Sequence, residues 1–316
     1  MNPQLDTDWR RRLGGTGIAI VAPSAYARVP QDLERALDWL RAHGCRVRDY
    51  HDPAARQTRF AASDAERIAQ LHAAAQDPEV QVVIALRGGY GASRLLPALD
   101  FDLLAQSGKL FVGHSDFTAV QMGMLARGGQ SIAGPMICDD FTAAPLSEYT
   151  LQSLLHCLCG PVCQVEWQAR DNPGIDLEGR LWGGNLTVLT SLLGTPYLPR
   201  IEGGILFVED VNEHPYRIER MLLQWLHSGV LQRQAALVLG DFSGYRLGEY
   251  DNGYDFSSML AFLRATLPIP VITGLPFGHV RDKASLALGS RTRLRTQADA
   301  AQLEMSDYHR LAPGLV

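Results

Sequence analysis

The sequence lacks the features that mark membrane, exported and nucleic-acid-binding proteins. No apolar window approaches the length of a membrane-spanning helix. The formal net charge is −5, so no basic face for nucleic acid or an anionic membrane is expected. The apolar run that follows Arg10-Arg11-Arg12 is too short for the hydrophobic region of an export signal. These absences predict a cytoplasmic protein that binds neither nucleic acid nor membrane.

Cysteine is scarce and its spacing is poor for metal binding. The chain has five cysteines, an odd number that argues against a secreted disulfide framework. Cys157, Cys159 and Cys163 form a C-x-C-x3-C cluster, but no paired second knuckle accompanies it. We therefore expect reduced thiols packed as small apolar residues, and no metal or other cofactor.

The first half of the chain alternates between two kinds of pattern. Apolar runs typical of buried strands lie at 18–22, 80–86 and 110–112. Stretches of helical periodicity separate them, and the capping box Ser63-x-x-Glu66 opens one of these helices. This alternation predicts parallel βαβ units. Arg87-Gly88-Gly89 and Gly113-His114-Ser115 follow two of the strands. Because such strands end at one edge of the sheet, the two segments are expected to share a crevice.

The pattern changes after Pro135. Residues 139–178 lack sustained alternation of strand and helix, and we interpret 141–175 as the crossing between two domains. Beyond it lie buried strands at 204–208, 236–239 and 268–274, and a tail of short antiparallel strands. The predicted fold class is α/β. It comprises a parallel-sheet N-terminal domain over 1–140 and a smaller, β-rich C-terminal domain over 176–316.

Ser115 stands at a predicted strand-to-helix turn, between the run 110–112 and a helical segment over 118–126. A serine at such a turn has its hydroxyl lifted clear of the sheet, which is the nucleophile-elbow geometry of serine hydrolases. Phe117 occupies the position at which the usual elbow pattern has its second glycine. The alternative interpretation is a serine that caps the following helix.

A serine nucleophile needs a base, and the base needs an orienting acceptor. His279 lies in a glycine-flanked loop after a buried strand, as an exposed catalytic histidine would. His114 is a poor base because neighbouring residues of a strand point to opposite faces. Candidate acids after strands are Glu209, Asp210 and Asp241. These patterns leave the acid unassigned, and they leave open that His279 is a loop residue with no role.

Four blocks follow one another along the chain: Gly113-His-Ser-Asp-Phe-Thr, Gly179-Arg-Leu-Trp-Gly-Gly-Asn-Leu, Val208-Glu-Asp-Val-Asn-Glu-His-Pro-Tyr-Arg and Ile272-Thr-Gly-Leu-Pro-Phe-Gly-His. They resemble the LD-carboxypeptidases, a serine-peptidase family also called muramoyltetrapeptide carboxypeptidases. The likeness covers nearly the whole chain, and the separations of the blocks are similar to those of the family. The resemblance implies a parallel α/β N-terminal domain, a smaller β-rich C-terminal domain, and an active site across their interface.

The resemblance also implies the roles of individual residues. Ser115 would be the nucleophile, Glu209 the acid and His279 the base of a Ser-Glu-His triad. The backbone N–H groups of Gly89 and Asp116 would form the oxyanion hole, where two donors stabilise the tetrahedral oxyanion by several kcal/mol. No metal would be needed.

The sequence does not settle the orienting acid or the residues that bind the substrate. Glu213, in the same block as Glu209, is the alternative acid. Arg87 and Trp182 are the expected substrate-binding residues. A carboxypeptidase must bind a free C-terminal carboxylate, for which an arginine fork is suited. Arg87, Arg217 and Arg281 are the candidates, and each of them could equally form a structural ion pair.

The substrate implied by the resemblance is the tetrapeptide stem of peptidoglycan. The bond to be cut joins the L-centre of meso-diaminopimelate to the terminal D-alanine. The family resemblance suggests a homodimer, and a cytoplasmic location suits the turnover of imported cell-wall fragments.

Two other functions are considered. Microcin C self-immunity proteins resemble these peptidases but cut an amide in a peptidyl-nucleotide, and they would need an added aromatic contact for the nucleobase. No obvious insertion supplies one. Alternatively, Arg87-Gly-Gly-Tyr-Gly would cradle phosphate in a non-catalytic nucleotide-binding module. That segment lacks the Lys-Ser/Thr of a P-loop and the spacing of a dinucleotide fingerprint. A covalent serine probe separates the two classes, because only a hydrolase should be labelled at Ser115.

Overall fold

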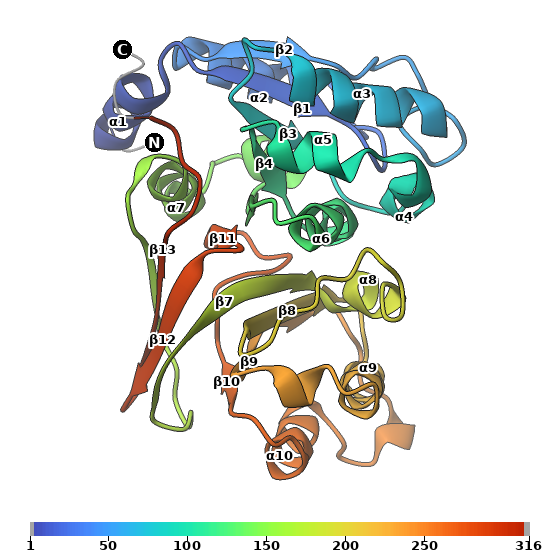
Figure 1. The fold of residues 1–316 in the computed structure, drawn as a ribbon, viewed down its shortest axis with the longest axis vertical. Coiled ribbons are helices and arrows are strands. Elements are labelled where there is room, and N and C mark those ends of the chain that lie inside the picture. The colour runs from blue at the N-terminus through green and yellow to red at the C-terminus, as the bar shows by residue number, and fades with distance from the viewer. Residues whose placement is uncertain (1–2, 313–316) are drawn as a thin grey trace.

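The computed structural model describes the backbone of residues 3–312 and the side chains of residues 8–312. Its strands form two sheets, one above the other in Figure 1. The first sheet has six strands in the order β11-β5-β4-β3-β1-β2. The second has seven, in the order β10-β9-β8-β7-β12-β13-β6.

The first sheet is built from parallel strands of the N-terminal half. These strands are β1 (Gly17–Val21), β2 (Arg46–Asp49), β3 (Val82–Ala85), β4 (Leu110–Gly113) and β5 (Ser131–Ala133). The accompanying helices are α1 (Pro3–Leu13), α2 (Pro30–Ala42), α3 (Asp64–Gln76), α4 (Ala92–Leu95), α5 (Phe101–Gln106) and α6 (Thr118–Ala126). The capping box predicted at the start of α3 is confirmed, because Ser63 and Glu66 each accept a hydrogen bond from the backbone N–H of the other.

The second sheet mixes two pairing modes. Its parallel strands are β7 (Ile175–Asn185), β8 (Ile205–Val211), β9 (Ala236–Ser243) and β10 (Val271–Thr273). Its antiparallel strands are β12 (Arg291–Gln297), β13 (Ala300–Ser306) and β6 (Cys163–Gln168). The helices of this half are α8 (Leu186–Ser191), α9 (Pro215–His227) and α10 (Phe256–Thr266). The predicted fold class, a parallel-sheet domain with a second β-rich domain, is confirmed.

Two features differ from what the sequence patterns suggest. The segment interpreted as the crossing between two domains, 141–175, contains α7 (Glu148–Cys159), which Ser147 caps, and the alternating strand β6. The strand β11 (Leu286–Leu288), from the C-terminal half, pairs antiparallel with β5 and so extends the first sheet. The division of the chain into 1–140, 141–175 and 176–316 stays a prediction.

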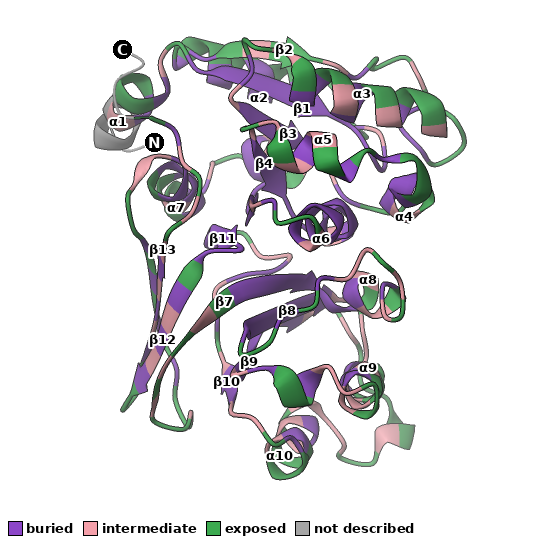
Figure 2. Cartoon of the chain, in the orientation of Figure 1, coloured by how far each residue is buried: buried purple, intermediate pink, exposed green. Residues whose placement is uncertain are grey.

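Helix α6 lies between the two sheets and is buried along almost its whole length (Figure 2). A helix that is apolar on every side needs such a surrounding. Glycine allows neighbouring segments to approach α6 closely on both of its sides. A Cβ on Gly123 would lie 2.2 Å from the Phe101 ring, and a Cβ on Gly184 would lie 2.6 Å from the Thr118 hydroxyl. The buried apolar side chains therefore form one cluster that spans both sheets.

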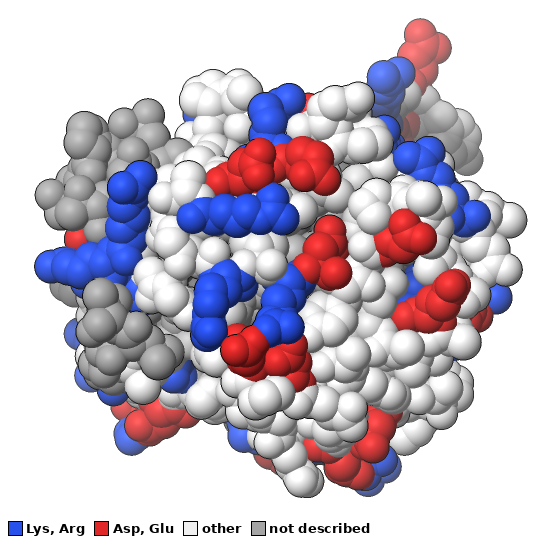
Figure 3. Space-filling model, turned by 90° about the horizontal axis from the view of Figure 1, so that it is seen from above, with Lys and Arg blue, Asp and Glu red and all other residues white. Residues whose placement is uncertain are grey.

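The surface carries charges of both signs. On the face shown in Figure 3, lysine and arginine side chains are interspersed with aspartate and glutamate. Within residues 3–312, no helix is long and apolar enough to cross a membrane.

Candidate active site

The turn after β4 holds Ser115 in a conformation that few residues other than glycine adopt. Its φ is +59°, in the left-handed region, and such strain is typical of a nucleophile elbow. Phe117 replaces the usual second glycine and is fully buried. The turn accommodates it because Gly113 has no side chain: a Cβ there would lie 2.7 Å from the Phe117 ring. Helix α6 has no side-chain cap, so Ser115 does not serve as one.

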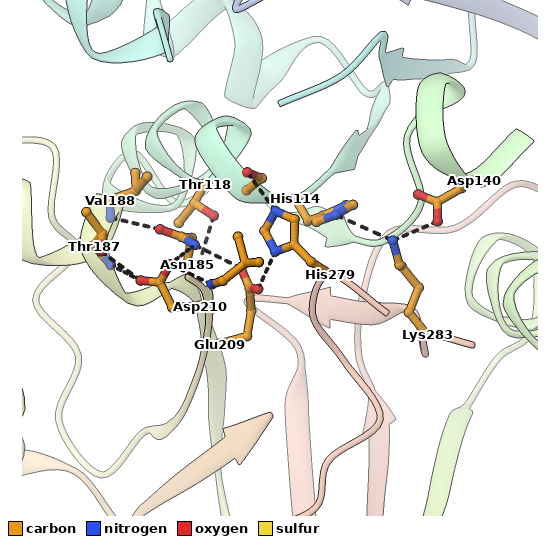
Figure 4. Close-up of polar contacts among 12 residues, drawn as sticks. His114, Thr118, Asp140, Asn185, Thr187, Val188, Glu209, Asp210, His279 and Lys283 are labelled. Carbon is orange, nitrogen blue, oxygen red and sulfur yellow. Dashed lines mark hydrogen bonds and ion pairs between the residues drawn. The ribbon is translucent and has the colours of Figure 1, made fainter. Parts of the chain in front are cut away.

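Three side chains from distant parts of the chain form a hydrogen-bonded series at the junction of the two sheets (Figure 4). The Ser115 hydroxyl lies 3.2 Å from His279 Nε2. His279 Nδ1 lies 2.9 Å from Glu209 Oε2. With its proton on Nδ1, the imidazole donates to Glu209 and accepts from the serine hydroxyl. This arrangement can activate a serine for nucleophilic attack.

Glu209 reaches the site from β8, at an irregularity in the pairing of this strand with β9. Its carboxylate is fully buried and accepts a second hydrogen bond, from Asn185 Nδ2 at 3.2 Å. The loop after β10 passes very close to Glu209 and Asp241. A Cβ on Gly278 would lie 2.9 Å from the Asp241 side chain and 3.4 Å from Glu209 Oε2. Glycine at this position therefore allows His279 to approach the buried carboxylate.

The surroundings of His279 raise its pKa above the ordinary value of 6.5. Burial lowers the pKa, but the hydrogen bond from the ring to Glu209 and the charge of that carboxylate raise it by more. The positive charge of Lys283 opposes this rise. The side chain keeps 26% of its exposure. The imidazole is therefore well prepared to hold the proton that a serine gives up during attack.

The other carboxylates of the region are engaged elsewhere. Asp210 accepts hydrogen bonds from the Thr187 backbone and hydroxyl, both at 2.8 Å, and so fixes the start of α8. Glu213 lies 3.7 Å from Arg217, and burial and the charge of Asp210 raise its pKa. The carboxylate beside the histidine is thus that of Glu209.

The glycine-rich loop after β3 is tied to the nucleophile turn by Asp116. Its carboxylate accepts hydrogen bonds from the Ser24 hydroxyl at 2.6 Å and from the Ala92 N–H at 2.8 Å. Burial raises its pKa. The N–H of Gly89 has no hydrogen-bond partner among the described residues. The N–H of Asp116 lies in the first turn after Ser115, where helical N–H groups lack internal partners. Both groups can therefore serve a substrate oxygen, as an oxyanion hole requires.

A cleft of about 670 Å³ opens beside the serine. Ser115, Asp116 and Gly89 line it from the first sheet, and Asn185 and Asp210 line it from the second. Its volume is within the range of about 300–1,000 Å³ that small-molecule sites occupy.

The two expected substrate contacts lie elsewhere. Trp182 is fully buried, donates from Nε1 to Gln234 at 2.9 Å and packs on Trp225. Trp182 does not line the cleft beside Ser115, and its binding role stays a prediction. The half-buried Arg87 donates to the Tyr26 carbonyl at 3.4 Å and does not line the cleft.

A second buried network lies on the other side of His279. The ring of His114 meets that of His279 edge-on, with centroids 5.3 Å apart. His114 Nδ1 lies 2.9 Å from the Gly134 carbonyl, and Nε2 lies 3.5 Å from Lys283 Nζ. Lys283 in turn pairs with Asp140 at 2.7 Å, and both side chains are almost fully buried. Burial and the charge of Lys283 lower the pKa of His114, so this ring stays neutral.

The sequence patterns assign no role to Lys283, Asp140 or Asn185. Lys283 is one of two lysines in the whole sequence, the other being Lys109. The scarcity of lysine in a chain that otherwise uses arginine could have drawn attention to Lys283 as a residue with a specific partner. Asn185 closes the Trp-Gly-Gly-Asn block, so its position in a motif was visible, although its contact with Glu209 was not.

The cysteine cluster lies away from the triad. Cys157 and Cys163 are buried, Cys159 is half-buried, and all five thiols are free. Among the described residues, no group of three or more histidine, cysteine, aspartate or glutamate side chains is arranged to hold a metal ion.

Comparison with known proteins gives consistent results. Residues 18–134 match the family model described as LD-carboxypeptidase N-terminal domain, and residues 178–294 match LD-carboxypeptidase C-terminal domain. A crystal structure of muramoyltetrapeptide carboxypeptidase from Oxalobacter formigenes is 54% identical, with a TM-score of 0.90, over 93% of this chain and 99% of that chain. The murein tetrapeptide carboxypeptidase of Pseudomonas aeruginosa is 32% identical, over 88% of this chain and 92% of its own length.

A more distant likeness is to the microcin C7 self-immunity protein. Its wild-type structure has a TM-score of 0.83 at 21% identity, over 94% of this chain and 97% of that chain. At this identity the likeness shows the shared fold alone.

We expect Lys283→Met to lower the free energy of unfolding by about 3 kcal/mol, measured by urea denaturation. The reason is that the variant leaves Asp140 buried without its cationic partner. The double variant Lys283→Met/Asp140→Asn should recover part of the loss, because no buried charge remains.

The matched control is Arg291→Met. Arg291 pairs with Glu178 at the same distance, 2.7 Å, but on the surface, and its loss should change stability little. Equal effects of the two single substitutions would contradict the importance of burial for the Lys283 pair.

Proposed function

The chain belongs to the LD-carboxypeptidase family, and from this membership and the geometry of its Ser–His–Glu series we propose that it is a serine carboxypeptidase acting on murein tetrapeptide. It releases the terminal D-alanine by cutting the bond to the L-centre of meso-diaminopimelate. The observation that carries the proposal is the hydrogen-bonded series from Ser115 through His279 to Glu209.

The reaction begins with attack of the Ser115 oxygen on the diaminopimelate carbonyl carbon. The serine proton passes to His279 Nε2, and the buried carboxylate of Glu209 stabilises the imidazolium through Nδ1. The carbonyl oxygen, now negative, is held by the N–H groups of Gly89 and Asp116. Asp116 has a second task, because its carboxylate positions the loop that carries Gly89.

Collapse of the tetrahedral intermediate breaks the bond to D-alanine. The proton held on His279 moves to the departing amine, which leaves as free D-alanine. A water molecule then attacks the acyl-enzyme, with the same imidazole as base, and restores the serine. Each proton that the histidine accepts it later returns, so the enzyme is unchanged after one cycle.

Peptidase action on murein is favoured over microcin immunity. The 54% identical structure and the Pseudomonas aeruginosa relative carry the names of murein peptidases, whereas the immunity protein shares the fold at 21% identity. A purely nucleotide-binding role is not proposed, because the glycine loop after β3 lies against the nucleophile: a Cβ on Gly88 would lie 2.7 Å from Ser115 Oγ.

We also propose that the enzyme is a cytoplasmic homodimer. The family resemblance supports both statements, and the five free thiols suit a reducing compartment. Sedimentation should give a particle of twice 34.7 kDa. A particle of 34.7 kDa at micromolar concentration would contradict the dimer and leave the peptidase proposal intact.

The function is tested by incubating the protein with murein tetrapeptide and measuring free D-alanine. The wild type should release it. Ser115→Ala should lose about 10⁴-fold or more in kcat, because the hydroxyl forms the acyl-enzyme. The control Ser228→Ala removes an exposed hydroxyl just after the end of α9 and should keep the wild-type rate. A Ser115→Ala enzyme with substantial activity would rule out the serine mechanism.

The pH dependence tests the His279–Glu209 pair. Because the base must be neutral, kcat/KM should fall as the pH decreases through the His279 pKa, which lies above 6.5. Glu209→Gln removes the charge that raises this pKa. We expect it to move the acid limb to lower pH and to reduce kcat by about 10⁴-fold.

Glu213→Gln is the matched control, since it makes the same chemical change four residues along the chain. The acid limb should keep its position, and kcat should fall far less. A shift of the limb in Glu213→Gln, with none in Glu209→Gln, would assign the orienting acid to Glu213.

A further inference from the structure

Two cavities flank the Ser115–His279 pair. The cleft described above lies on the side of Asn185 and Asp210. A second cavity of about 320 Å³ is lined by His279, Arg281 and Lys283, together with residues at the start of α7. Figure 4 shows His279 between Asp210 on one side and Lys283 on the other. We call the second space the Lys283 cavity.

The two cavities differ in charge. The cleft is lined by three carboxylates, those of Asp116, Asp210 and Glu213, and by no lysine or arginine. A peptide with a free terminal carboxylate would be repelled there. The Lys283 cavity contains the cations Arg281 and Lys283 as well as Asp139 and Asp140. It is therefore the more favourable side for an anionic group.

Within the Lys283 cavity, the two cations have different surroundings. Lys283 is buried and already neutralised by Asp140 at 2.7 Å. Arg281 is exposed, and its guanidinium has no hydrogen bond or ion pair with the described residues. A guanidinium also presents the planar fork that binds a carboxylate through two hydrogen bonds. Arg281 is thus the cation that remains available for a ligand.

The loop that carries Arg281 is held firmly. The backbone carbonyl of Arg281 accepts a hydrogen bond from the Thr150 hydroxyl at 2.9 Å. The same hydroxyl accepts a hydrogen bond from the backbone N–H of Lys283 at 3.0 Å. The Ser147 hydroxyl donates to Asp282 at 2.6 Å. These bonds fasten the loop to the start of α7. The arginine therefore projects from a fixed backbone beside His279.

Proton transfer decides which side the leaving group occupies. His279 Nε2 must give its proton to the departing amine, so that amine lies next to the imidazole. The oxyanion points instead to Gly89 and Asp116, which line the cleft. The leaving residue therefore extends toward the cavity that His279 lines, and the acyl part of the peptide lies in the cleft.

We propose that the Lys283 cavity is the leaving-group subsite and that Arg281 binds the free carboxylate of the departing D-amino acid there. The inference rests on the proposed function and adds to it the residue that makes the enzyme a carboxypeptidase. Repulsion of the terminal carboxylate from the acidic cleft and its attraction to Arg281 both favour this orientation of the peptide. No chemical step beyond the hydrolysis already described is involved.

The test compares two substrates, the tetrapeptide with a free terminal carboxylate and the same peptide ending in D-alanine amide. The wild type should prefer the free acid. In Arg281→Ala, kcat/KM for the acid should fall by about 10- to 100-fold, because a charge-assisted pair is lost. The value for the amide should stay within about twofold of wild type, so the preference should nearly vanish. Arg281→Lys should restore part of it, because the charge returns without the fork.

Arg200→Ala is the matched control, because it removes an exposed arginine that lines neither cavity. It should leave the acid-to-amide ratio unchanged. Equal losses on both peptides in Arg281→Ala, or an unaltered preference, would overturn the proposal. Failure of the wild type to release D-alanine or D-alanine amide from either peptide would instead contradict the proposed function. Thermal unfolding of each variant establishes that the fold is retained.

Discussion

The burial of α6 between the two sheets is the constraint on which the site depends. The helix begins at the nucleophile turn, and nearly every residue from Thr118 onward is enclosed by apolar side chains. At its start, the Thr118 hydroxyl accepts a hydrogen bond from the Asn185 N–H at 3.2 Å, across the junction of the sheets. The serine of one sheet is thereby placed against the histidine and glutamate of the other. Because a misplacement of about 1 Å can cost two orders of magnitude in rate, this packing matters directly for chemistry.

A second principle of the site is the balance of charges around one imidazole. Glu209 holds one ring nitrogen of His279 and stabilises its protonated form. On the opposite side of the His279 ring lie the neutral ring of His114 and the buried Lys283–Asp140 ion pair. The charge of Lys283 lowers the pKa of His279 and so opposes the effect of Glu209. Asp140 in turn pairs with Lys283. The net effect is a His279 pKa above its ordinary value, and in the proposed mechanism this ring first accepts and then donates a proton.

Much of the architecture follows from local patterns. The buried runs 18–22, 80–86 and 110–112 coincide with β1, β3 and β4 to within one or two residues at each end, because β-branched and apolar residues favour strands enclosed on both faces. Helix α7 and strand β6 were missed, since three prolines in 139–178 hid a capped amphipathic helix and a clear alternation. The return of β11 to the first sheet was not predictable, because a three-residue strand carries no signal for its partner.

The sequence by itself determined the chemistry that is available: a serine at a strand-to-helix turn, a histidine in a glycine-flanked loop, acids at strand ends, and blocks that resemble one peptidase family. It could not choose between Glu209 and Glu213 by pattern alone, and it suggested Trp182 as a substrate contact. Tertiary structure decided which of these side chains lie together. Glu209 of β8 and His279 of the loop after β10 form one hydrogen-bonded series with Ser115 at the junction of the sheets, whereas Trp182 is buried in the core. The physical reason is that a hydrogen bond depends on distance and burial, and contacts between residues 70 and 164 positions apart are set by packing.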